Sequence, residues 1–205
     1  EALLLYGPSG IGKSLMTVNL ALYLAKPPQN ALLWGLFKVP KAAKTLFIQS
    51  ENGWYSTQNR LQLMAKVRPE FEEALGSLLF PKLRNDCRFV GDLLDRNFQN
   101  HLQELIFSTG AGMLVLDPLI SYHSKNENDN AEMRKSLDSL TALCEETGVT
   151  VLVVHHAGKG GTMGGARGAS AITDWAANIL SLERTDTDQD SLTIKVKHEK
   201  SRNFQ

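Results

Sequence analysis

Residues 7–14 read Gly7-Pro8-Ser9-Gly10-Ile11-Gly12-Lys13-Ser14. They match the pattern G-x-x-x-x-G-K-[S/T] at every fixed position. Glycines in such a loop accept positive φ angles, which turn successive backbone N–H groups toward a phosphate chain. The lysine of the pattern reaches the β- and γ-phosphates, and the hydroxyl after it binds Mg²⁺. We therefore predict that this segment binds ATP, with Lys13 on the phosphates and Ser14 on Mg²⁺.

The residues on either side of the loop support this interpretation. Leu3–Tyr6 is an apolar run that we expect to form a buried strand, and Ser14–Ala25 is expected to form a helix that ends near Pro27-Pro28. A strand before the loop and a helix after it bring the positive end of the helix dipole to the phosphates. The alternative is a glycine-rich turn that binds nothing, and the two flanking elements argue against it.

The rest of the chain alternates apolar runs with longer amphipathic stretches. We expect further strands at Thr45–Gln49, Arg88–Val90, Met113–Leu116 and Val149–Val154. We expect further helices at Ser56–Lys66, Pro69–Leu79, Asn97–Ser108 and Ala131–Glu146. This alternation indicates an α/β fold with a mostly parallel sheet and helices on both faces. Asn178–Leu182 and Ser191–Lys197 flank a polar turn, which predicts an antiparallel hairpin at the C-terminal edge.

Length and charge restrict the class of protein. A chain of 205 residues suffices for one well-buried domain and is too short for two, and we expect residues 1–205 to form a fragment of a longer chain, because a strand begins at once without a Met. Basic and acidic residues number 22 each, so only a local basic patch would bind nucleic acid. No apolar run approaches the roughly 20 residues that cross a bilayer. We expect a cytoplasmic protein without a membrane partner, with Cys87 and Cys144 as thiols.

Two carboxylates follow predicted strands. Asp117 ends the apolar run Met113–Leu116, and there it could hold the Mg²⁺ that Ser14 also binds. The alternative is an aspartate that caps the turn at Pro118. Glu51 follows the strand Thr45–Gln49, where it could orient the water that attacks the γ-phosphoryl group. A solvated loop carboxylate is the alternative for Glu51.

Taken together, these segments resemble the RecA-like P-loop ATPases, and more narrowly the RepA-type hexameric replicative DNA helicases and their DnaB-type relatives. The matching segments are Gly7–Ser14, Gln49–Asn52, Leu114–Asp117, Val153–Lys159 and Arg167–Ser170. The resemblance implies a RecA-like core that hydrolyses ATP with Mg²⁺, and it assigns Glu51 as the catalytic glutamate. It also implies a homo-oligomer, a ring of six subunits around single-stranded DNA.

The resemblance assigns three more residues to the active site. His156 would sense the γ-phosphate and relay its presence to DNA-binding loops. The alternative for His155 and His156 is one buried, hydrogen-bonded histidine beside one exposed histidine. Lys200 and Arg202 would reach the nucleotide of the neighbouring subunit, and the alternative for them is a basic, frayed chain end.

A glycine-rich loop follows the two histidines. It covers Ala157–Ser170 and carries Lys159 and Arg167, which suit the tracking of phosphates in single-stranded DNA without sequence readout. No aromatic residue is present in it for base stacking, so a loop that covers the nucleotide or contacts another subunit is the alternative.

The function expected from the resemblance is an ATP-driven, ring-forming motor on single-stranded DNA, a replicative helicase of plasmid or phage type. The alternative is a RecA-like ATPase of the recombinase or regulatory type that does not unwind DNA. A small-molecule kinase shares the phosphate-binding pattern, but the sequence contains no lid-like arginine cluster.

Overall fold

The fold is described by a computed structural model, which covers residues 1–27, 32–34, 37–81, 89–124, 129–156, 170–185 and 193–202. Within these residues one sheet has the strand order β3-β2-β4-β5-β1-β6-β7. Its strands are β1 (Ala2–Gly7), β2 (Lys44–Gln49), β3 (Leu78–Leu79), β4 (Ala111–Asp117), β5 (Thr150–His156), β6 (Asn178–Arg184) and β7 (Ile194–Ser201). All neighbouring strands are parallel except β6 and β7, which form an antiparallel pair at one edge. The predicted fold class is confirmed.

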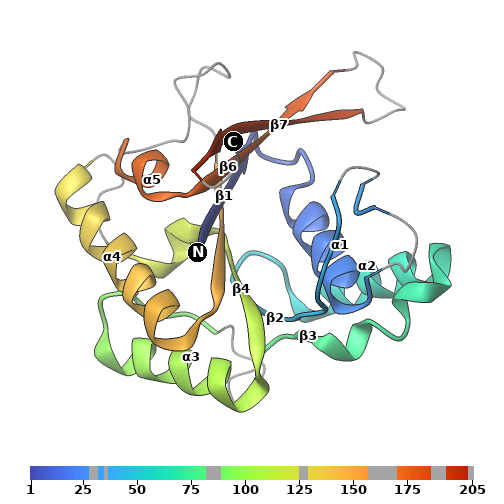
Figure 1. Ribbon diagram of the computed structural model, residues 1–205, viewed down its shortest axis with the longest axis horizontal. Coiled ribbons are helices and arrows are strands. Elements are labelled where there is room, and N and C mark those ends of the chain that lie inside the picture. The colour runs from blue at the N-terminus through green and yellow to red at the C-terminus, as the bar shows by residue number, and fades with distance from the viewer. Residues whose placement is uncertain are drawn as a thin grey trace.

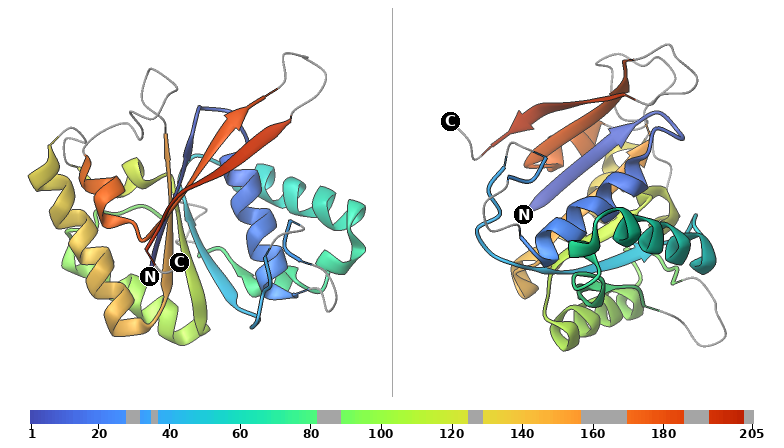
Figure 2. Two further views of the ribbon diagram at one scale, coloured as in Figure 1. Left: turned by 45° about the horizontal axis from the view of Figure 1, so that its top comes forward. Right: turned by 90° about the vertical axis from the view of Figure 1, so that its right-hand side faces the viewer.

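Helices cover both faces of the sheet (Figures 1 and 2). One face carries α1 (Lys13–Ala25) and α2 (Trp54–Val67). The other face carries α3 (Arg96–Thr109), α4 (Asn130–Thr147) and α5 (Ser170–Trp175). Three short 3₁₀ helices connect these elements: η1 (Pro69–Phe71), η2 (Leu75–Ser77) and η3 (Leu119–Tyr122). No helix in the described part of the chain has the length and hydropathy to span a bilayer.

The sheet separates two hydrophobic clusters, and successive strand residues alternate between them. Leu114 and Leu116 of β4 pack into the cluster beneath α3 and α4, whereas Val115 packs into the cluster beneath α1. All three side chains are fully buried. Because both faces of the central strands are covered, their sequences are apolar without polar alternation, as parallel sheets require.

Two predicted elements are wrong. Pro69–Leu79 is not one helix but the two 3₁₀ turns η1 and η2, followed by β3. Gly76 weakens a helix at this point, and Leu78 is buried as a strand residue beside Thr45 of β2. The strand expected at Arg88–Val90 is absent for Phe89 and Val90, while Arg88 lies outside the described residues.

The end of the glycine-rich segment also differs from expectation. Ser170 was expected in a loop, but it begins α5. The side-chain oxygen Oδ1 of Asn130, the first residue of α4, accepts hydrogen bonds from Ala171 N–H at 3.1 Å and from the Ser170 hydroxyl at 3.4 Å. The Trp175 indole N–H donates to Thr141 Oγ1 at 2.9 Å, which joins the other end of α5 to α4.

The register of the parallel strands brings four distant parts of the chain to one edge of the sheet. Gly7 at the end of β1 lies beside His156 at the end of β5, and Gln49 at the end of β2 lies beside Asp117 at the end of β4. We call this the carboxyl edge. Because β7 runs in the opposite direction, its last residue, Ser201, pairs with the first residue of β6. This pair lies at the amino ends of the parallel strands, which we call the opposite edge.

Candidate active site

The predicted phosphate-binding loop joins β1 to α1 at the carboxyl edge. Gly10 and Gly12 have φ angles of 75° and 99°, in the left-handed region that other residues seldom adopt. Gly7 packs so closely on β6 that a Cβ atom would lie 2.9 Å from the carbonyl oxygen of Leu182. The glycines at these positions are therefore required by backbone geometry, and Gly12 leads directly into α1.

Lys13 lies inside this loop, with 6% of its surface exposed. Its Nζ donates hydrogen bonds to the carbonyl groups of Gly7 at 2.9 Å and Pro8 at 2.8 Å. Burial lowers the pKa of Lys13, while the carboxylates of Asp117 and Glu51 raise it. A buried ammonium group with two nearby acidic side chains is positioned to bind an anion that arrives from outside.

Asp117 and Ser14 form a pair of oxygen side chains beside the lysine. Asp117 is 5% exposed at the end of β4, and burial raises its pKa although the Ser14 hydroxyl beside it lowers it. A nearby divalent cation would favour the charged carboxylate and offset the cost of burial. Hydroxyl and carboxylate oxygens are ligands that Mg²⁺ accepts, with phosphates and water completing its shell. The two residues therefore fit the ion that the sequence predicts.

His156 lies between the loop lysine and Glu51. Its Nδ1 is 3.5 Å from Lys13 Nζ, and its Nε2 is 3.6 Å from Glu51 Oε1. The Glu51 side chain is 54% exposed, so it is free to turn, whereas His155 is buried with 1% exposed. One buried and one partly exposed histidine was the alternative to a sensor role, and this arrangement agrees with both interpretations.

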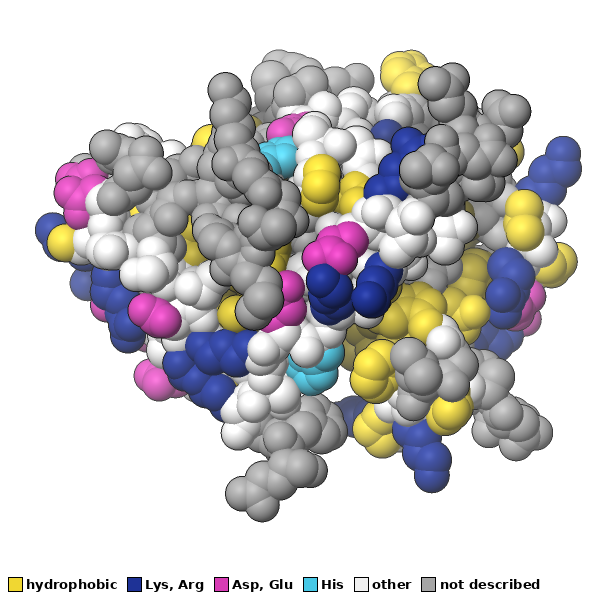
Figure 3. Space-filling model, turned by 90° about the horizontal axis from the view of Figure 1, so that it is seen from above, with side chains coloured by type: hydrophobic (Ala, Val, Ile, Leu, Met, Phe, Trp, Pro, Cys, Tyr) yellow, Lys and Arg dark blue, Asp and Glu magenta, His cyan; other side chains and the backbone are white. Residues whose placement is uncertain are grey.

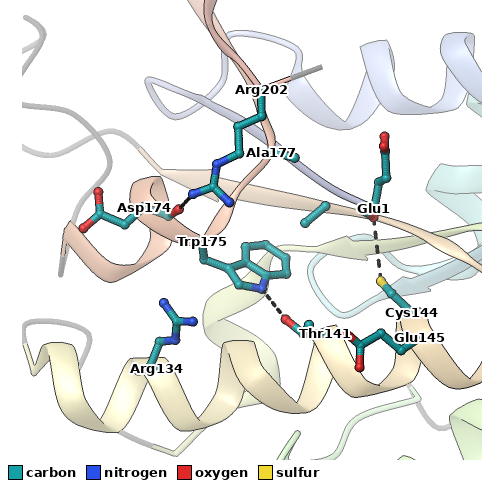
Figure 4. A pocket seen from close by; sticks show the side chains of 10 residues that line it. Glu1, Arg134, Thr141, Cys144, Glu145, Asp174, Trp175, Ala177 and Arg202 are labelled. Carbon is teal, nitrogen blue, oxygen red and sulfur yellow. Dashed lines mark hydrogen bonds between the residues drawn. The ribbon is translucent and has the colours of Figure 1, made fainter.

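The structure places Lys200 and Arg202 away from this site, near the opposite edge. Lys200 Nζ donates to the carbonyl groups of Thr173 at 2.6 Å and Asp174 at 3.1 Å, at the end of α5. Arg202 donates to the same Asp174 carbonyl (Figure 4). Arg202 and Arg134 line a hollow of about 390 Å³ between α4, α5 and the start of β1. Within one chain, Lys200 and Arg202 therefore do not contact the phosphate-binding loop.

The predicted DNA-binding residues Lys159 and Arg167 lie outside the described residues. The nearest described residues before and after them are His156 and Ser170. The segment that carries Lys159 and Arg167 therefore connects the candidate active site to α5 in the chain.

An apolar groove that the sequence did not predict begins at Gly12. It has a volume of about 640 Å³ and is lined by Leu15, Trp34, Phe37, Ile194 and Val196, among others. Figure 3 shows hydrophobic side chains gathered in a hollow on the α1 side of this face. A flat, partly apolar group such as a nucleotide base could fit beside the loop here. The sequence did not predict this groove because its lining comes from α1, α2, β6, β7 and residues 34 and 37, which only the folded chain brings together.

Comparison with known proteins agrees with this fold. Residues 1–162 match a protein-family model described as "AAA domain". The crystal structure of a KaiC-like protein from the hyperthermophilic archaeon Pyrococcus horikoshii OT3 has the same fold, with a TM-score of 0.60 and 20% sequence identity. The match covers 98% of this chain and 79% of that chain. Because the family model covers most of the chain and the fold matches over nearly all of it, the chain belongs to the AAA-domain family and has a RecA-like P-loop ATPase core.

Proposed function

We propose that the chain is an ATP-hydrolysing, ring-forming motor on single-stranded DNA, of the replicative helicase type. One observation carries the proposal: Lys13, Glu51, Asp117 and His156 come from four separate strand ends and lie together at the carboxyl edge. These are the residues that the sequence assigned to phosphate binding, water activation, Mg²⁺ binding and phosphate sensing.

The geometry suggests how these residues divide the chemistry of phosphoryl transfer. Lys13 would exchange the Gly7 and Pro8 carbonyl groups for β- and γ-phosphate oxygens, and Ser14 and Asp117 would hold Mg²⁺. The bound ion supplies positive charge to the phosphate oxygens. Glu51 orients a water molecule for in-line attack, and its exposed side chain can rotate to reach it.

His156 is suited to report the state of the nucleotide. Its imidazole lies between the lysine that binds the γ-phosphate and the glutamate that acts on it. A γ-phosphate that draws either side chain away changes the contacts of His156, which precedes the segment that carries Lys159 and Arg167. ATP binding and DNA binding would be linked through this one side chain.

A transition state for phosphoryl transfer gains greatly from an added cation. Lys200 and Arg202, held near the opposite edge, suit a role on the nucleotide of a neighbouring subunit. This assignment requires a head-to-tail assembly, in which one face of each subunit meets the opposite face of the next, and a ring is the closed form of such an assembly.

A second function is favoured by a specific observation. Lys200 and Arg202 already bind backbone carbonyl groups of their own chain at the end of α5. If that is their whole role, no ring is needed, and the chain is a RecA-like ATPase of the recombinase or regulatory type that does not unwind DNA.

Three measurements on the purified chain separate these functions. The oligomeric mass is measured with and without a non-hydrolysable ATP analogue, and a ring of six supports the motor while a stable monomer argues strongly against it. ATP hydrolysis stimulated by single-stranded DNA supports a DNA-dependent ATPase and excludes a small-molecule kinase. Strand displacement from a forked duplex then distinguishes the helicase from the ATPase that does not unwind DNA.

A further inference from the structure

The turn that carries Glu51 is fastened to the end of β4. Ser50, the residue before Glu51, is 7% exposed, and its backbone N–H donates to the Asp117 carbonyl oxygen at 3.2 Å. Its side-chain hydroxyl donates to the Ser121 hydroxyl in η3 at 2.6 Å. The backbone beside the proposed water-orienting residue is thus tied to the backbone of the proposed Mg²⁺ ligand.

The other side of the same turn is fastened as well. The side-chain amide of Gln49 donates to Thr57 Oγ1 at 2.6 Å, and that hydroxyl donates to the Gly53 carbonyl oxygen at 3.3 Å. Thr57 is the buried residue of α2, at 3% exposed. Glu51 therefore projects from a turn that is held at both ends, although its own side chain is half exposed.

A buried tyrosine completes this polar cluster. Tyr122 follows Ser121 in η3 and is fully buried, and among the described residues its hydroxyl has no hydrogen-bond partner of normal geometry. Burial raises its pKa, the Ser50 hydroxyl lowers it, and the carboxylates of Asp117 and Glu51 raise it further. The phenol is therefore close to Ser50 and within the field of both carboxylates.

Stability does not explain this tyrosine. A buried polar group without a partner costs about 1–3 kcal/mol, whereas a phenylalanine would fill the same space without that cost. Thr45 and Ser136 carry buried hydroxyls without a described partner as well, but the Tyr122 phenol is distinguished by the field of two acidic side chains of the candidate site. Unsatisfied buried polar groups often mark functional sites.

We propose that Ser50, Ser121 and Tyr122 are positioning residues for Glu51. The Ser50 N–H bonds to the Asp117 carbonyl, the Ser50 and Ser121 hydroxyls bond to each other, and Tyr122 follows Ser121 in η3; together they fix the backbone from which the Glu51 side chain turns. The role depends on the proposed function, because it requires that Glu51 orients the attacking water. Misplacement by about 1 Å of a group that acts in the transition state can cost about 10²-fold in rate.

The first test compares steady-state ATP hydrolysis by Ser50→Ala, Ser121→Ala and Tyr122→Phe with that of the wild type. We expect kcat to fall about tenfold, below the cost of a full 1 Å misplacement, with an unchanged KM and unchanged affinity for a non-hydrolysable analogue. Ser121→Thr retains the hydroxyl and should restore kcat. A rise in KM that matches the loss of kcat, or an unchanged kcat in all three variants, would overturn the positioning role.

Ser136→Ala and Thr45→Val are matched controls. Both remove a buried hydroxyl that has no partner among the described residues, one in α4 and one at the far end of β2 from Glu51. We expect both to keep the wild-type kcat. If they lose kcat as much as Ser50→Ala does, buried hydroxyls matter only for general stability, and the proposal fails.

The decisive test repeats the substitutions in a Glu51→Gln background. If the cluster acts through Glu51, Ser50→Ala and Tyr122→Phe should cause no further loss of kcat in that background. A further tenfold loss would overturn the positioning role while leaving Glu51 as the water-orienting residue. Normal hydrolysis by Glu51→Gln alone would instead refute the assignment of Glu51. Tyr122→Phe and Ser121→Ala each remove a single oxygen atom, so they carry the test if Ser50→Ala does not fold.

Discussion

Two lysines at opposite ends of the molecule bind the backbone in the same way. Lys13, after β1, and Lys200, in β7, each donate two hydrogen bonds from Nζ to carbonyl groups of the chain. Burial lowers the pKa of both. Their neighbours differ: the carboxylates of Asp117 and Glu51 raise the pKa of Lys13, whereas the guanidinium of Arg202 further lowers that of Lys200 and the carboxylate of Asp174 raises it.

This difference shows that the same carbonyl contacts serve two kinds of site. Around Lys13, the carboxylates of Asp117 and Glu51 balance the positive charge of the lysine. A polyphosphate that binds there adds negative charge, which the Mg²⁺ bound to it neutralises. Around Lys200 and Arg202, two positive groups share the end of one short helix, whose carbonyl groups carry only partial negative charge. The Asp174 carboxylate offsets part of this charge, so two cations share one nearby anion.

The largest expected effect separates the two lysines directly. Lys13→Ala should lose detectable ATP binding or hydrolysis, because the β- and γ-phosphates lose the cation that lies inside the loop. Lys200→Ala should bind ATP as the wild type does, since its ammonium lies near the opposite edge of the sheet. Titration with a fluorescent ATP analogue measures both, and equal affinities for the two variants would refute the assignment of the loop.

The next effect tests whether Arg202 acts across a subunit boundary. Arg202→Ala should bind ATP normally but hydrolyse it about 10³–10⁵-fold more slowly, the value of an arginine that stabilises the transition state. Mixed with Lys13→Ala subunits under exchange, it should recover part of the activity, because an intact loop can then face an intact Arg202.

Subunit exchange is confirmed by mass before the mixed activity is measured. Activity above the sum of the two separate variants supports action in trans. If exchange occurs without recovery, Arg202 serves only the end of α5 in its own chain. Lys13 would then bind the nucleotide, whereas Lys200 and Arg202 would only stabilise the fold.

A smaller effect concerns the segment that begins after His156. Replacing Lys159 and Arg167 together with alanine should weaken the binding of single-stranded DNA and leave basal ATP hydrolysis intact. The slope of log affinity against log salt concentration should become less steep by about 0.7 for each lost phosphate contact. An unchanged slope, measured by fluorescence anisotropy at several salt concentrations, would remove this segment from the DNA path.

The smallest effect concerns the contact between β1, which leads into the phosphate-binding loop, and β7, which carries Lys200. Tyr6, the residue before the phosphate-binding loop, donates to Glu199 of β7 at 2.5 Å, and burial with this carboxylate raises the pKa of Tyr6 to about 12. The neutral phenol therefore adds stability that is fully present below the ordinary tyrosine pKa of 10 and is lost as pH rises toward 12.

Tyr6→Phe should accordingly lower the free energy of unfolding by about 1 kcal/mol at neutral pH, or about 2–4 °C in Tm for a domain of this size. It should also remove part of the alkaline decline in stability between pH 10 and 12. Ser181→Ala is the control, since Ser181 donates to the other oxygen of Glu199 at 2.7 Å and does not titrate. The same alkaline decline in wild type and Tyr6→Phe would contradict this account.

Much of the candidate site could be predicted because its parts are local in sequence. Eight consecutive residues specify the loop, and Asp117 and Glu51 each follow an apolar run that reads as a buried strand. Parallel strands then bring such residues to one edge without further information. The helix predicted at Pro69–Leu79 was wrong for the opposite reason: Leu78 pairs with Thr45, more than thirty residues away, and this contact overrides a local preference.

Short-range pattern and backbone chemistry were enough to predict the mostly parallel α/β core, the loop around Lys13 and the antiparallel edge. Three features emerge only when the chain folds: His156 lies between Lys13 and Glu51, Lys200 and Arg202 bind the end of α5, and Ser50 bonds to Ser121. Each of these contacts joins residues far apart in the chain, and their distances depend on how the whole sheet aligns its strands, which no local pattern of residues encodes.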